Sequence, residues 1–211
     1  MGRRLLLIGV VLALAGAAPA AAAPRVLWPG VTYDQQVQTT SRGPVIIHVL
    51  TGPRPGGATT LEPLLSNESL LGRETVTSMQ RRTEAVATTA GISGDFSNFE
   101  TGLPSGVLIR ETQLLFPPYG DRSSAGVLSD GTLDVRRISF FATWQGTTLK
   151  HTLNDLNRPV RANGAGLFTS AYAASTPSYA DGVAVVLFPL PTAVPGVDLP
   201  APVVEARGAG A

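Results

Sequence analysis

Residues 86–97 of this chain read VATTAGISGDFS. Small, β-branched and apolar residues lead up to Ile92 in a run too short for a helix, which predicts a buried strand. Gly94 and Asp95 then form a pair that is typical of a sharp turn. We therefore expect Asp95 where a strand ends, with room for a ligand because Gly94 has no side chain. The same pair is common in ordinary turns, so this stretch alone favours a turn residue over a site.

The segments before this stretch indicate one helix and one strand. Residues 74–83 are predicted to be helical because apolar residues recur on one face at helical spacing. Arg81 and Arg82 near its end are expected to complement the helix dipole rather than to hold a phosphate. Residues 44–51 are predicted to form an apolar strand, and residues 26–39 are expected to be an irregular lead-in.

A hairpin is predicted on the C-terminal side of Asp95. Residues 125–128 and 133–141 are its strands, joined by a turn at 129–132. A proline-rich loop brings Arg122 to the start of this hairpin. The chain contains 23 glycines and 17 prolines, which favour turns and short strands over long helices. The expected fold class is mixed α/β (α+β), a β-rich mixed sheet with one main helix in an incomplete domain.

Aromatic and polar residues alternate between residues 140 and 161, where Trp144, His151 and Asn154 occur. Sugar-binding surfaces combine an aromatic face with amides, so this segment could line a carbohydrate groove. A tryptophan in a strand is more often a core residue. Both interpretations stay open at this point.

The first 23 residues have the organisation of a secretory signal peptide. A basic start is followed by an apolar run over residues 5–15 and by small residues that offer A-x-A cleavage sites. The run is short for a membrane span, and an uncleaved anchor is the alternative interpretation. The protein is expected to be secreted or in the cell envelope, with no stable membrane insertion after cleavage.

Composition excludes several function classes. The 16 basic and 15 acidic residues give a net charge of +1, so there is no electrostatic footprint for nucleic acid. The absence of cysteine excludes disulfides and thiolate metal sites. No phosphate-binding Gly-Lys-Ser/Thr loop occurs, no cofactor is expected, and no metal ligands are assigned.

Five blocks of the sequence occur in a recognisable order. They are ETVTSMQRR at 74–82, GISGDF at 91–96, PSGVL at 104–108, DRSSAG at 121–126 and TWQGT at 143–147. Together they resemble the first half of the phosphodiester glycosidase domain, whose family contains bacterial relatives of N-acetylglucosamine-1-phosphodiester α-N-acetylglucosaminidase, the mannose 6-phosphate uncovering enzyme. The resemblance implies a domain over residues 24–190 after the signal peptide at 1–23. Residues 191–211 are then a Pro/Gly-rich tail or the start of the remaining domain.

Two features depart from the pattern of this family. Ser93 stands where the family usually has Asn, and Ser97 where it usually has a second Phe. A hydroxyl can donate or accept a hydrogen bond as an amide does, but it is shorter. The later Asp-Gly-Gly-Gly-Ser block of the family does not occur in these 211 residues.

The resemblance implies an exported hydrolase that acts on a carbohydrate or sugar-phosphate substrate. It would cleave the bond between an anomeric carbon and a phosphodiester, and phosphate leaves with little protonation, so one ionised carboxylate could suffice. The expected catalytic residues are Asp95, which steadies the oxocarbenium-like centre or activates water, and Arg122, which holds the phosphate together with Ser123. The other expected substrate-binding residues are Ser93, Gly94, Glu100, Ser105 and Gly106.

Two alternatives belong to other classes. The altered block at Ser93 and the absent later block are compatible with a non-catalytic module that binds envelope glycans. They are equally compatible with a truncated, inactive fragment.

Overall fold

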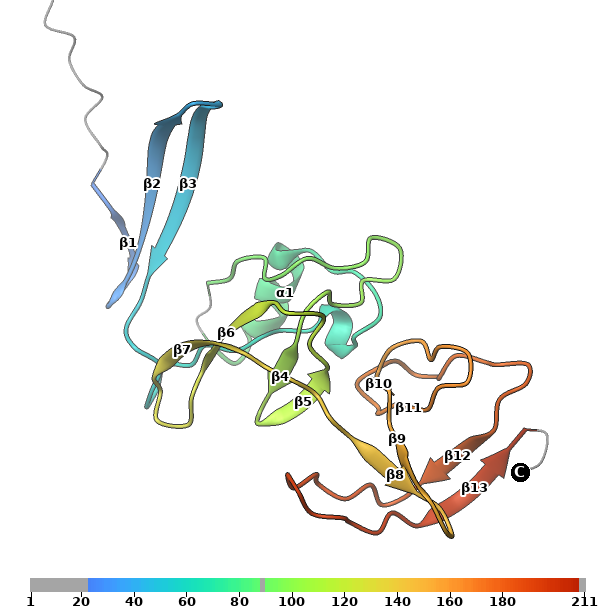
Figure 1. Ribbon diagram of the computed structural model, residues 1–211. Helices are drawn as coiled ribbons and strands as arrows, with labels where there is room; N and C mark the ends of the chain where they lie inside the picture. The colour runs from blue at the N-terminus through green and yellow to red at the C-terminus, as the bar shows by residue number, and fades with distance from the viewer. Residues whose placement is uncertain (1–22, 88–89, 209–211) are drawn as a thin grey trace, which may run out of the picture. The chain divides into compact units, whose positions relative to one another are not determined.

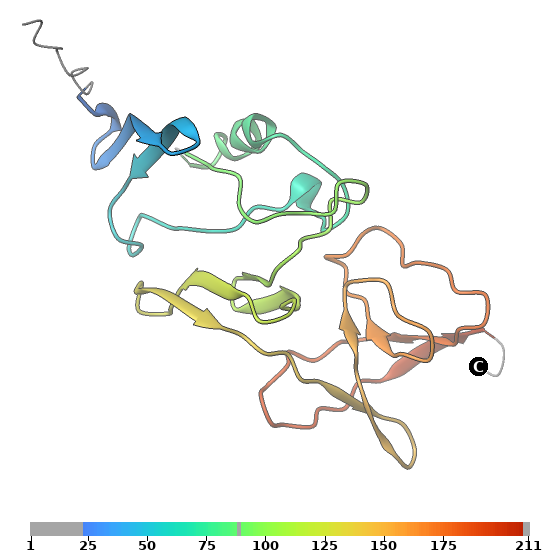
Figure 2. The ribbon, with the colours of Figure 1, turned by 45° about the horizontal axis from the view of Figure 1, so that its top comes forward.

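A computed structural model describes residues 23–87 and 90–208 of this chain. Within these ranges the fold is β-rich α+β, with one α-helix, α1 (Val76–Thr83), and one 3-10 helix, η1 (Ser66–Glu68). The strands form one three-stranded sheet and several separate pairs rather than the single mixed sheet expected from sequence (Figures 1 and 2). No helix among the described residues is both long and apolar enough to cross a membrane. Apart from Ala23, the expected signal peptide at 1–23 lies outside the described residues.

The first compact unit contains the described residues up to Thr60 together with residues 127–132. Its antiparallel sheet has the order β1 (Arg25–Trp28), β2 (Val31–Thr40), β3 (Gly43–Thr51). The β2–β3 turn closes at Gly43, whose φ of +110° favours glycine, and Thr40 Oγ1 donates to the Gly43 carbonyl at 2.8 Å. The strand predicted at 44–51 is confirmed as β3.

The irregular lead-in expected over residues 26–39 is wrong. Most of this segment belongs to β1 and β2, and β2 pairs with β3 from Thr32↔Thr51 to Thr40↔Gly43 without a break. The long partner strand supplies hydrogen bonds to the backbone of β2 along its whole length, which local propensity did not indicate.

The second compact unit contains residues 61–126 and the described residues after 132. Its strands are β4 (Leu108–Arg110), β5 (Gln113–Phe116), β6 (Ser123–Val127), β7 (Leu133–Arg137), β8 (Thr143–Gln145), β9 (Lys150–Thr152), β10 (Asp155–Leu156), β11 (Gly166–Leu167), β12 (Ala184–Leu187) and β13 (Val203–Arg207). Strands β6 and β7 form the hairpin predicted from sequence, although Val127 and the turn cluster with the first unit. In Figures 1 and 2 the strand pairs of the second unit are short ribbons.

The helix predicted at 74–83 is confirmed, but it begins two residues later. Thr75 is its N-cap, and its hydroxyl oxygen accepts a hydrogen bond from the Ser78 N–H at 3.1 Å. This bond satisfies one of the free N–H groups of the first turn. The amphipathic pattern is weakly used, since none of the helix residues is fully buried.

The buried strand predicted before Asp95 is wrong for the residues that the structure describes. Residues 84–87 continue from α1 as a turn, and residues 90–94 are irregular; Thr88 and Thr89 lie outside the described residues. Val86 is 86% exposed and Ile92 is 77% exposed. Val86 and Ile92 are therefore exposed rather than buried, and the described residues 84–87 and 90–94 belong to no strand.

The core of the second unit joins segments that are far apart in sequence. Leu65, Leu70, Leu103, Phe116 and Tyr172 form one buried apolar cluster. Backbone hydrogen bonds join the same segments: Leu70 N–H donates to Ala171 O at 2.8 Å, and Leu71 N–H donates to Tyr172 O at 3.1 Å. Residues 65–71 and 171–172 are thereby held together by both apolar packing and hydrogen bonds.

Asn157 is a fully buried amide beside this core. Its Nδ2 donates to Leu115 O at 2.8 Å and to Thr169 Oγ1 at 2.9 Å, and its Oδ1 accepts from Thr169 N–H at 2.7 Å. A buried amide with donors and acceptor all paired stabilises a unique arrangement of the segments that it joins.

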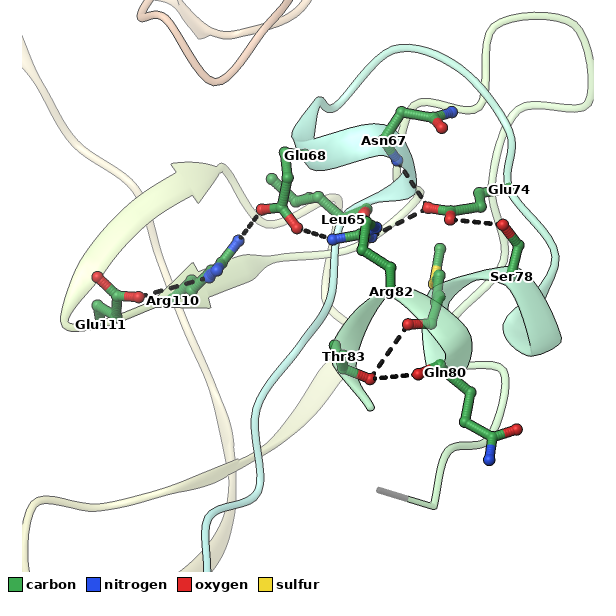
Figure 3. A network of polar contacts seen from close by, with 11 residues as sticks. Leu65, Asn67, Glu68, Glu74, Ser78, Gln80, Arg82, Thr83, Arg110 and Glu111 are labelled. Carbon is green, nitrogen blue, oxygen red and sulfur yellow. Dashed lines mark hydrogen bonds and ion pairs between the residues drawn. The ribbon is translucent and has the colours of Figure 1, made fainter. Parts of the chain in front are cut away.

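An ion-pair network fixes α1 to the neighbouring segments (Figure 3). Arg82 donates to Leu65 O at 2.9 Å, pairs with Glu74 at 3.0 Å and also contacts Glu68. Arg110 of β4 pairs with the other oxygen of Glu68 at 2.8 Å. Arg82 was expected only to complement the helix dipole, but its ion pair with Glu68 connects α1 to η1. The ion pair of Glu68 with Arg110 then connects η1 to β4.

Glu74 is the most strongly perturbed acid of this network. The hydrogen bond from Arg82, together with those from the Asn67 N–H and the Ser78 hydroxyl, lowers the pKa of Glu74 from 4.5 to about 2. Because the folded-state pKa lies below the unfolded value, the resulting stability is present above pH 4.5 and is lost as pH falls toward 2.

Replacing Glu74 with Gln should therefore flatten the acid limb of the stability profile. The unfolding temperature of the wild-type protein should decrease as the pH is lowered from 4.5 to 2. Glu74→Gln should have a lower unfolding temperature than the wild type at pH 7, and its unfolding temperature should decrease less on acidification. Asp181→Asn is the matched control, because Asp181 is exposed and makes no ion pair in the described part of the chain. Parallel profiles for wild type and Glu74→Gln would contradict the role of this carboxylate.

Candidate functional site

Asp95 lies at the open end of a narrow loop that runs back on itself. Ser105 N–H donates to Phe96 O at 2.9 Å, and Ser97 and Pro104 form an isolated antiparallel bridge. Further along the loop, Asn98 N–H donates to Leu103 O at 2.8 Å. The residues on either side of this ladder, Asp95 and Gly106, are thereby placed opposite each other.

The closed end of this loop is a turn over residues 98–103. Asn98 Oδ1 accepts from the backbone N–H groups of Glu100 and Thr101 at 2.9 and 2.8 Å. Such an Asx arrangement is a common use of asparagine, because its short amide reaches the backbone two or three residues ahead. Gly102 ends the turn with a φ of +80°, a conformation that favours glycine.

The turn docks on Gly72 and Arg73. Gly72 N–H donates to Thr101 O at 2.8 Å, and Arg73 Nη1 donates to Phe99 O at 2.9 Å. The backbones approach so closely that a Cβ on Gly102 would lie 1.9 Å from Gly72 O. Leu103, 8% exposed, joins the apolar core directly after this contact. The loop that carries Asp95 is therefore anchored to the core at its closed end.

Asp95 and Arg122 form an ion pair at the open end of the loop. Arg122 Nη2 donates to Asp95 Oδ1 at 2.8 Å, and Arg122 Nη1 donates to Ser105 O at 3.3 Å. The Phe96 N–H also donates to Asp95 Oδ1, at 2.7 Å. Both charged side chains are partly accessible, with 45% of Arg122 and 42% of Asp95 exposed. One guanidinium thus bridges the two sides of the loop.

The second carboxylate oxygen of Asp95 is free to accept a proton or contact a ligand. Asp95 Oδ2 makes no hydrogen bond to any residue that the structure describes. It occupies the space that a side chain at Gly106 would fill, because a Cβ there would lie 2.4 Å from Oδ2. The absence of a side chain at Gly106 therefore determines where this oxygen points.

The structure does not bring all the sequence-predicted residues to this ion pair. Asp95, Arg122, Ser105 and Gly106 are in contact as described. Ser93 and Gly94 lie on the exposed irregular segment before Asp95, Glu100 lies in the turn at the closed end, and Ser123 follows Arg122 at the exposed start of β6. Within the described ranges, no hydrogen bond joins the side chains of Ser93, Glu100 or Ser123 to Asp95 or Arg122.

Sequence reasoning missed the residues that position the loop. Asn98, Gly102 and Gly72 hold the turn, and the Phe96 N–H orients the carboxylate. Asn98 followed four residues later by Gly102 is a turn signal that was present in the sequence. The partner of that turn, Gly72, had no local signal, because the contact joins residues far apart in sequence.

A metal centre is not evident in the described ranges 23–87 and 90–208. No three His, Asp or Glu side chains there gather closely enough to hold an ion. The charged side chains that pair at Asp95 are one carboxylate and one guanidinium.

Substituting Gly106 with Ala should displace Asp95 while leaving the fold nearly intact. The new Cβ must push Oδ2 away, and loss of an exposed ion pair costs only about 0–1 kcal/mol of unfolding free energy. The Phe96 amide resonance should shift strongly in ¹H–¹⁵N spectra, since that N–H donates to Asp95. Gly126→Ala is the control, as a Cβ there meets no atom within 4 Å. An unmoved Phe96 resonance in Gly106→Ala would show that the close approach does not exist.

No family model, no curated protein and no solved structure matches this chain. The resemblance carried by the five sequence blocks therefore stays a prediction, and the geometry around Asp95 and Arg122 is the main physical support for a function.

Proposed function

We propose that this chain is an exported hydrolase that cleaves sugar 1-phosphodiesters, with Asp95 as its carboxylate and Arg122 as its phosphate holder. The observation that carries the proposal is the 2.8 Å ion pair between these residues, in which Asp95 Oδ2 stays free. The pair was expected from two sequence blocks, although Asp95 and Arg122 are 27 positions apart. Both side chains are partly exposed.

The pair suits a reaction in which the leaving group is a phosphate. A phosphodiester anion placed next to a lone carboxylate would be repelled, and Arg122 offsets this repulsion because it contacts Asp95 while offering further donors. Its bonds to Asp95 and Ser105 O use two of the five N–H groups of a guanidinium. The remaining groups can bind phosphate oxygens in the paired geometry that arginine favours.

Asp95 has two possible tasks at the anomeric carbon. Its free oxygen can stabilise the positive charge that develops as the phosphate departs, or it can take a proton from the attacking water. Either task requires that Oδ2 keep its position beside Gly106, because a carboxylate turned away by about 1 Å loses much of its effect. Ser123 and Ser93 remain candidates for contacts that form only with substrate bound.

We further propose that another segment of protein covers the exposed apolar side chains of this loop. Ile92 and Phe96, which flank Asp95 in sequence, and Phe99 in the turn at the closed end are 77%, 75% and 79% exposed. Large exposed apolar side chains that lie close together mark contacts with a partner or a ligand. The Asp-Gly-Gly-Gly-Ser block of the resembled family would supply such a segment.

Conservative substitution of the pair tests the proposal. Asp95→Asn should lower kcat for release of sugar from a hexose or N-acetylhexosamine 1-(methyl phosphate) diester by about 100-fold or more. Arg122→Gln should mainly raise KM, because it removes a phosphate contact. Asp130→Asn is the matched control, since the Asp130 carboxylate accepts from the Thr132 N–H in the β6–β7 turn and is not in contact with Asp95 or Arg122 in the described part of the chain. Wild-type rates from Asp95→Asn would remove Asp95 from the mechanism.

A further inference from the structure

A second accessible polar surface lies on the β8–β9 hairpin and shares no residue with the Asp95 site. Strands β8 and β9 pair antiparallel, with Trp144 directly opposite His151. The two rings stack with centroids 4.8 Å apart and planes inclined by 25°. Trp144 is 46% exposed, so it is not a core tryptophan. A stacked aromatic pair of this kind presents a rigid apolar surface that loses little entropy on binding.

An open depression of about 330 Å³ adjoins this aromatic pair. Its volume is at the lower end of the range for small-molecule sites, roughly 300–1,000 Å³. Its walls come from the hairpin and from a following turn, and they consist of Trp144, His151, Thr152, Asn154, Asn163, Gly164 and Ala165.

The amide side of the depression is held in place by the backbone. Asn154 Oδ1 accepts from Ala165 N–H at 3.0 Å, and Asn154 N–H donates to Ala165 O at 2.8 Å. Gly164 packs closely, since a Cβ there would lie 3.0 Å from Arg161 O. Asn163 has a φ of +58°, which turns the chain back toward Asn154. The polar groups of this wall are thus positioned before any ligand binds.

Several polar groups around the depression lack a protein partner. Among the residues that the structure describes, no hydrogen bond involves the Trp144 indole N–H, the His151 ring nitrogens, the Asn154 Nδ2 or the Asn163 side chain. Water or a ligand must satisfy them. Together they offer both donors and acceptors beside an aromatic surface.

The charge around the depression favours a neutral ligand. None of its lining residues carries a fixed charge. Two cations that flank the depression in sequence are paired, Lys150 with Asp198 at 2.7 Å and Arg158 with the buried Asp155. Arg161 is exposed and makes no ion pair with a described residue, but its side chain does not line the depression. An anion would find no fixed cation among the lining residues, whereas hydroxyl groups match their amide and imidazole groups.

We infer that this depression is a carbohydrate-binding site for a neutral hexose unit, built from residues other than those of the Asp95 site. The apolar C–H face of the pyranose packs on the Trp144–His151 pair. Its hydroxyl groups bind Asn154, Asn163 and the ring nitrogens. The site would hold a glycan chain on this protein whether or not Asp95 is catalytic.

Tryptophan fluorescence of the full chain tests the inference directly. The chain has two tryptophans, so Trp28→Phe leaves Trp144 as the single reporter. Cellohexaose, laminarihexaose, maltohexaose and mannohexaose are titrated into this variant, and at least one should give a saturable change in emission. Asn163→Gly in the same background should weaken that binding by about threefold or more, because glycine keeps the backbone conformation and removes the amide.

The affinity for the responding oligosaccharide is then measured by calorimetry on single variants that keep Trp28. Trp144→Ala should weaken binding by about tenfold. Phe141→Ala should leave it unchanged, since Phe141 is 92% exposed and does not line the depression. Asp95→Asn should also bind normally, which separates this site from the proposed hydrolase. No saturable response to any of the four oligosaccharides, or equal affinity in Trp144→Ala, would overturn the inference.

Discussion

The candidate site depends on one close contact between two backbones, at Gly102 and Gly72. With a side chain at Gly102 the turn over residues 98–103 could not reach Gly72, because the added atom would lie 1.9 Å from its carbonyl oxygen. The contact lets Gly72 N–H bond Thr101 O and lets Leu103 enter the core. Asp95 lies at the other end of the same ladder, so its position follows from how this turn is held.

Buried polar groups supplement the small apolar core in holding the second unit together. Without cysteine, no disulfide contributes. Asn157 joins the segments at 115 and 169 through a fully paired amide. The partly exposed Glu74–Arg82–Glu68–Arg110 network joins α1, η1 and β4. Buried Asp155 depends on Arg158, and breaking that pair would strand a charge at a cost of about 3–5 kcal/mol.

Local signals predicted the elements that local physics determines. The helix at 76–83 has its Thr75 cap and its amphipathic pattern in sequence, and the β6–β7 turn has Asp130 and Gly131. The run over residues 86–92 was predicted to be a buried strand from composition alone. Burial requires a partner strand, and whether one exists is set by contacts distant in sequence, which a single window cannot contain.

The candidate site could be predicted only in part, because some of its contacts also join residues that are distant in sequence. The blocks that resemble the family contain Asp95 and Arg122, so both residues were predicted to lie in one site. Gly106 was predicted to belong to it because it lies in the same block as Ser105. The contact that holds their loop in place was not predicted, since Gly72 is 30 positions from Gly102 and has no pattern of its own. The proximity of Asp95 and Arg122 could be predicted from sequence, whereas the backbone contact between Gly102 and Gly72 could not.

Amide hydrogen exchange in Gly102→Ala tests most directly whether the Gly102–Gly72 contact positions Asp95. Gly196→Ala is the reference, because Gly196 has a similar φ of +75° against +80° but no atom within 4 Å of its added Cβ. The account predicts that the Gly72, Asn98 and Ser105 amides exchange at least about tenfold faster in Gly102→Ala than in Gly196→Ala. Equal exchange of these three amides in the two variants would contradict it.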